Sequence, residues 1–132
     1  MTIHDDVSLA ADLCDASKGL ISDVPNSVAA VGSWLTSSTG LVMSAGTPIE
    51  VDGRQGMSWD MSLPIGCADN GGPSNAVVSF QAGEHHRVYA IPTGTDTIIV
   101  FTWGAGYGGA GEEKLSDINA WADQLVASMR FN

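Results

Sequence analysis

A glycine-rich segment at residues 104–111 is the part of the chain that most resembles a cofactor motif. Gly104, Gly106 and Gly109 form the pattern GxGxxG, with which dinucleotide-binding proteins bring the backbone close to a pyrophosphate at a helix N-terminus. This segment contains no lysine or arginine, and two glutamates follow it where the phosphate charge would lie. We therefore interpret it as a connection between the last strand and the last helix, and we expect no cofactor.

Two histidines and one carboxylate are the other candidates for chemistry. His85 and His86 are adjacent, so on a strand they point to opposite faces and cannot both bind one metal ion. Asp60 lies in a run of alternating polar and apolar residues, and we expect it on the solvated face. The sequence has no GxSxG motif and no recurring metal-ligand spacing. We expect no metal site and no catalytic residue. The alternative is a small enzyme that uses Asp60, His85 or His86 as general acid or base.

The chain has two cysteines, Cys14 and Cys67, which permit a single disulfide. In an oxidising compartment this bridge would close a long loop and stabilise the fold by ~4 kcal/mol in the chain-entropy model. Two reduced thiols are the alternative, because spacing alone does not show that the two residues meet.

An antiparallel sheet is the element that must position these residues. Asp52-Gly53 favours a tight hairpin turn, and residues 57–63 alternate as a strand with one buried face does. Five extended runs are predicted, at residues 41–51 (interrupted at 46–48), 57–63, 76–80, 87–91 and 97–103. Short connections between them predict a meander of about five strands. The last run is apolar almost throughout, which predicts a central position.

Helices are predicted before and after these strands. A short helix is expected at residues 7–17 and a second at 26–38, and a regular apolar stripe predicts a C-terminal helix at 116–131. Trp59 and Trp121 fall on the apolar positions of their elements, so both are expected in the core. All 132 residues are predicted to form a single α+β domain, with the sheet covered by the C-terminal helix and the N-terminal helices.

The chain is strongly acidic. Fifteen acidic and five basic residues give a net charge of −10, which repels phosphate backbones and anionic lipid. Nucleic acid is therefore not expected as a partner, and a small molecule or a cationic protein is. No apolar run is long enough to span a membrane, and the first residues lack the basic and apolar parts of a signal peptide. Any membrane attachment is expected to come from a segment outside this chain.

Several short motifs occur together in an order that resembles a known group of domains. They are Trp34-Leu35, Leu41-Val42-Met43, Val51–Gly56, the strand that contains Trp59, Pro64–Cys67 and the closing residues Leu125–Phe131. From residue 25 onward, this order resembles the small extracytoplasmic domains of actinobacterial membrane-anchored proteins and lipoproteins. The arrangement also resembles the Mog1/PsbP-like α/β sandwich. The resemblance implies an exported location for a domain of a larger protein, whereas the chain taken by itself would be cytoplasmic.

The leading prediction from the sequence is a non-enzymatic binding or sensory module. Its site is expected at the end of the last strand, where Trp103 and Tyr107 wall a pocket beside Gly106 and Gly109, or in the loop that contains Asp69. A structural subunit that forms a homodimer through an uncovered sheet face is a further alternative.

Overall fold

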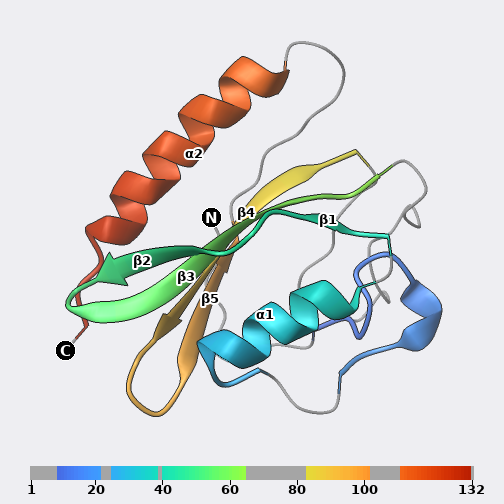
Figure 1. The fold of residues 1–132 in the computed structure, drawn as a ribbon, viewed down its shortest axis with the longest axis horizontal. Helices are drawn as coiled ribbons and strands as arrows, with labels where there is room; N and C mark the ends of the chain where they lie inside the picture. The colour runs from blue at the N-terminus through green and yellow to red at the C-terminus, as the bar shows by residue number, and fades with distance from the viewer. Residues whose placement is uncertain (1–8, 22–24, 39, 65–82, 102–110, 132) are drawn as a thin grey trace.

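The fold places a five-stranded sheet between two helices (Figure 1). The computed structural model describes residues 9–21, 25–38, 40–64, 83–101 and 111–131. In chain order the elements are a 3-10 turn η1 (Ala16–Lys18), helix α1 (Val28–Ser37), strands β1 (Val42–Met43), β2 (Thr47–Val51), β3 (Arg54–Ser62), β4 (His85–Pro92) and β5 (Thr97–Phe101), and helix α2 (Gly111–Ala127). The predicted α+β class is confirmed. Within the described residues, neither helix is long and apolar enough to cross a membrane.

All strand pairs in the described sheet are antiparallel. The order is β1–β3–β4–β5, and β2 also pairs with β3. The predicted strand at 76–80 lies outside the described residues, and β3 pairs directly with β4. In the described sheet β5 pairs with β4 alone, so the predicted central position of the last strand is wrong there. The apolar sequence of β5 has another cause, because Ile99 packs against the core under α1 while Val100 is buried on the α2 side.

The β2–β3 hairpin turns where the sequence predicts it. Asp52 (φ 53°) and Gly53 (φ 75°) both take positive φ, as a type I′ turn requires. The turn also holds the end of the chain. The Phe131 N–H donates to Asp52 Oδ2 at 2.8 Å, and the Arg54 guanidinium lies 5.2 Å from the centroid of the Phe131 ring. These contacts fasten the residues after α2 to the sheet.

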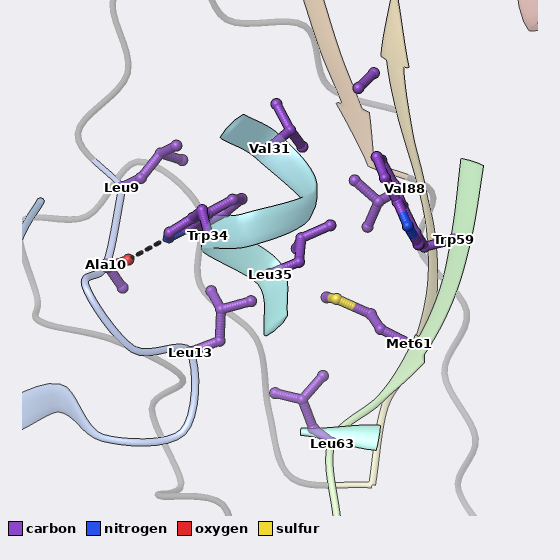
Figure 2. Packing of buried hydrophobic residues seen from close by; sticks show 11 residues of the cluster. Leu9, Ala10, Leu13, Val31, Trp34, Leu35, Trp59, Met61, Leu63 and Val88 are labelled. Atoms are coloured by element: carbon purple, nitrogen blue, oxygen red, sulfur yellow. Dashed lines mark hydrogen bonds between the residues drawn. The ribbon is translucent and has the colours of Figure 1, made fainter. Parts of the chain in front are cut away.

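One face of the sheet carries an apolar core covered by α1 and the N-terminal segment (Figure 2). Ser27 caps α1, since its hydroxyl accepts a hydrogen bond from the Ala30 N–H at 3.1 Å. The Trp34 indole N–H donates to the Ala10 carbonyl at 2.8 Å and ties the N-terminal segment to the helix. Trp59 of β3 is buried in the same core, as the alternating pattern predicts.

The N-terminal segment does not form the helix predicted at 7–17. Its described part is irregular apart from η1 and a single antiparallel β-bridge between Ala10 and Leu20. Asp12 Oδ1 accepts the Cys14 N–H at 2.9 Å, and Asp15 Oδ1 accepts the Ser17 N–H at 3.0 Å. Such local bonds from aspartate side chains compete with helical hydrogen bonds. Apolar spacing alone therefore gave the wrong prediction.

The other face of the sheet is covered by α2 through a narrow stripe. Ala122 and Val126 are buried against a second cluster that includes Tyr89 and Ile91 of β4. Trp121 is 57% exposed, so the prediction that it lies in the core is wrong. It directly precedes Ala122 and therefore points about 100° away around the helix. The small alanine, and not the tryptophan, faces the sheet.

Candidate functional site

Polar side chains gather on the sheet face toward α2, where β3 and β4 run side by side. Asp60 of β3 lies opposite Arg87 of β4 in the register of the two strands. Because successive residues of a strand point to opposite faces, the alternation that buries Trp59 under α1 turns Asp60 toward α2. Asp123 of α2 reaches the same place from above.

Asp60, Arg87, Tyr89 and Asp123 form one network, here named the clasp. Arg87 binds Asp60 through Nε to Oδ1 at 2.6 Å and through Nη2 to Oδ2 at 2.9 Å, and its Nη1 reaches Asp123 Oδ2 at 2.9 Å. The Tyr89 hydroxyl donates to Asp123 Oδ1 at 2.6 Å. Bidentate, charge-assisted hydrogen bonds are the strong ones in proteins. The clasp therefore links α2 to both central strands.

The surroundings raise two pKa values in the clasp. The hydrogen bonds to Asp60, and then those to Asp123, raise the pKa of Arg87 further above its ordinary value. Burial, and then the hydrogen bond to Asp123, raises the pKa of Tyr89. Arg87 therefore stays a cation and Tyr89 a neutral donor at neutral pH. Two carboxylates share this one guanidinium, so the clasp carries an excess of negative charge.

A cavity of about 370 Å³ lies between α2 and strands β2 to β4. Asp60, Arg87, Tyr89 and Asp123 border it, and it is named the clasp cavity. Ile49 of β2 and Ala127 of α2 are further wall residues. Its volume falls within the range of about 300–1,000 Å³ that small-molecule sites occupy. Charged groups and an apolar wall thus meet around one cavity.

A second cavity of about 340 Å³ adjoins the first. It is named the edge cavity, and Val42 of β1, His85 of β4 and Asn119 of α2 border it. Ser44 and Asp60 border both cavities. The two cavities therefore adjoin at these two residues, and together they are named the groove.

The residues predicted to form a pocket after the last strand cannot be compared with this groove. Outside the described residues lie Trp103, Gly106, Tyr107 and Gly109, together with Asp69 and Cys67. The pocket and the Cys14–Cys67 bridge stay predictions.

The three residues of the enzyme alternative, Asp60, His85 and His86, all border the edge cavity. His86 lies opposite Met61 of the α1 core in the strand register, and its Nε2 is 2.9 Å from Glu84 Oε2, with both side chains buried. Both oxygens of Asp60 accept hydrogen bonds from Arg87. Within the described residues no group of three His, Cys, Asp or Glu side chains could hold a metal ion.

Sequence reasoning missed Arg87, Tyr89 and Asp123. Arg87 and Tyr89 alternate with Val88 and Ala90, as Asp60 alternates with its apolar neighbours. The polar face of each strand was therefore predictable separately. The contact among the four residues depends on the register of β3 with β4 and on the position of α2 over the sheet, which the sequence does not specify.

Comparisons of the chain with protein-family models, with curated proteins and with solved structures found no match. The function is therefore argued from the clasp and the groove beside it.

Proposed function

We propose that this chain is a non-enzymatic binding module whose ligand places a positive charge in the clasp cavity. The observation that carries the proposal is the pair of carboxylates, Asp60 and Asp123, that share one guanidinium at the wall of a 370 Å³ cavity. Each of these carboxylates is about half exposed, at 51% and 52%, so an incoming cation can reach them. The net charge of −10 attracts a cation from a distance.

Binding fits the clasp cavity better than turnover does. Catalysis needs a proton acceptor or a nucleophile that is free to react. Asp60 is engaged by Arg87 on both oxygens, and Asp123 by Arg87 and Tyr89. A preorganised set of charges around a cavity, in which both carboxylates of the clasp are engaged, is the arrangement of a recognition site.

The ligand proposal is tested by titrating the protein with butylguanidinium and pentylammonium, each followed by calorimetry at low salt. Both cations are expected to bind, and neutral pentanol is expected to bind at least about tenfold more weakly, since it lacks the charge. Asp123→Asn is expected to weaken both cations by about tenfold. Circular dichroism of the variant shows whether α2 is retained.

The matched control for this titration is Asp117→Asn. Asp117 is an exposed carboxylate on the same helix and does not border the clasp cavity. It should leave the affinities unchanged within about twofold, because exposed charges at a distance are screened. Equal binding of pentanol and the cations, or an equal loss in the Asp117 and Asp123 variants, would refute the proposal.

We further propose that the module works outside the cytoplasm and carries a Cys14–Cys67 disulfide. Support for the bridge comes from Cys14, which is not a free thiol. Support for the location comes from the resemblance to extracytoplasmic domains and from the stability that such a bridge gives in an oxidising compartment. In protein purified without reductant and then denatured, a thiol reagent should detect no thiol, and after reduction it should detect two, the full cysteine content. Two thiols before reduction would contradict the bridge.

A further inference from the structure

We infer that the groove recognises an extended polypeptide segment with a basic side chain and an apolar side chain two positions apart. The basic side chain enters the clasp cavity and the apolar one enters the edge cavity. This inference rests on the proposed function and adds the class of ligand and its spacing.

The spacing follows from the strands that form the floor of the groove. Along β3, the clasp cavity reaches Ser58 and Asp60, and the edge cavity reaches Asp60 and Ser62. Along β3, the serine and aspartate that border the edge cavity are thus displaced by two strand residues, ~7 Å, from those that border the clasp cavity. In an extended peptide, side chains at positions i and i+2 point to the same side and are separated by the same distance. One such peptide, lying along the groove, therefore fills both cavities at once.

The edge cavity is suited to an apolar side chain. Val42 borders it and is 58% exposed, one of two large apolar side chains left exposed in the described residues. Val42 lies opposite Ser62 in the register, on the sheet face that carries the clasp. Asn119 also borders this cavity, and its Oδ1 is buried without a hydrogen-bond partner among the described residues. After a rotation of the amide, a peptide N–H supplies the donor that this oxygen lacks.

Charge selects a polypeptide over other occupants of the groove. A net charge of −10 repels nucleic acid and anionic lipid surfaces, and it equally repels a second copy of the chain. A peptide segment with lysine or arginine is attracted by the same field and supplies both side chains that the two cavities fit.

The test uses capped pentapeptides and the whole chain. In Gly-Arg-Gly-Leu-Gly and in its reverse, Gly-Leu-Gly-Arg-Gly, the two side chains have the required spacing. Gly-Arg-Gly-Ser-Gly lacks the apolar group, and Gly-Gly-Arg-Leu-Gly has the two side chains adjacent and so on opposite sides. Of the two peptides with the required spacing, the one with the higher affinity is expected to bind about tenfold more strongly than either comparison peptide. Neither comparison peptide can bury a leucine in the edge cavity while its arginine occupies the clasp cavity.

The Val42→Ser variant distinguishes binding of the leucine in the edge cavity from nonspecific hydrophobic binding elsewhere on the surface. It should abolish the preference for leucine over serine. Trp121→Ala removes the other exposed apolar side chain, which lies outside the groove, and should preserve the preference. Equal affinities for the leucine and serine peptides in the unmodified protein, or a preference that survives Val42→Ser, would overturn the inference while cation binding still stood. If butylguanidinium also failed to bind, the proposed function would fall with it.

Discussion

Replacing Trp59 with alanine is expected to lower the free energy of unfolding by about 3–5 kcal/mol, the usual cost of truncating a buried tryptophan. Trp59 is 9% exposed and lies between β3 and α1 in the first core (Figure 2). Two glycines make room for its ring. A Cβ added at Gly32 would lie 3.2 Å from Trp59 Cζ2, and one added at Gly46 would lie 2.9 Å from Trp59 Nε1. Removal of the indole therefore leaves a cavity beside Gly32 and Gly46. These two glycines cannot fill it, because they have no side chain beyond a hydrogen atom.

The effect of Trp59→Ala is measured by urea unfolding followed by circular dichroism. A domain of this size has a total stability of about 5–15 kcal/mol, so the variant should unfold at a much lower urea concentration. Trp121→Ala is the matched control, because it removes the same group from an exposed position and should change stability by less than about 0.5 kcal/mol. Similar losses in the two variants would contradict the assignment of Trp59 to the core.

Replacing Gly56 with valine should destabilise the sheet by about 3 kcal/mol, even though valine is a better strand former than glycine. A Cβ at Gly56 would stand 2.5 Å from the Ala90 carbonyl oxygen and 3.2 Å from Ile49 Cγ1. The first neighbour is backbone of β4 and cannot rotate away, so the strands must separate. Strand propensity favours valine by at most about 1 kcal/mol, whereas overpacking a buried site costs about 1–3 kcal/mol or more.

Gln55→Val provides the comparison for Gly56→Val on the same strand. Gln55 is exposed and its amide donates to Glu50, so its replacement should change stability by less than about 0.5 kcal/mol. Urea unfolding measures the free energy of unfolding of both variants. A Gly56→Val protein as stable as the Gln55→Val protein would show that β3 and β4 are not in contact at this point.

The elements that the sequence predicts best are those whose pattern is local. The Asp52-Gly53 turn and the alternation around Trp59 depend only on neighbours in the chain, and both are found as predicted. Glycine lowers the stability of a helix, and the sequence around Gly32 indicates nothing more about its role. Its proximity to the Trp59 ring gives it a packing role that no local pattern contains.

What the sequence could not give is contact between distant segments. The clasp joins Arg87 to Asp123 across 36 positions of the chain, and neither the spacing nor the residue types fix that pairing. The seating of α2 was also undetermined, because its apolar stripe is wide enough to bury either Trp121 or Ala122. The structure selects Ala122, and with it the orientation that aims Asp123 at the sheet.

The most direct test of the cation site is an NMR measurement of contacts between bound butylguanidinium and the protein. The proposal predicts nuclear Overhauser effects from the butyl protons to the Tyr89 ring of β4 and to the Ala127 methyl group of α2, which both border the clasp cavity. Contacts found instead at Trp121, or among the residues of the core beneath α1, would show that the charged cavity is not where this protein binds its ligand.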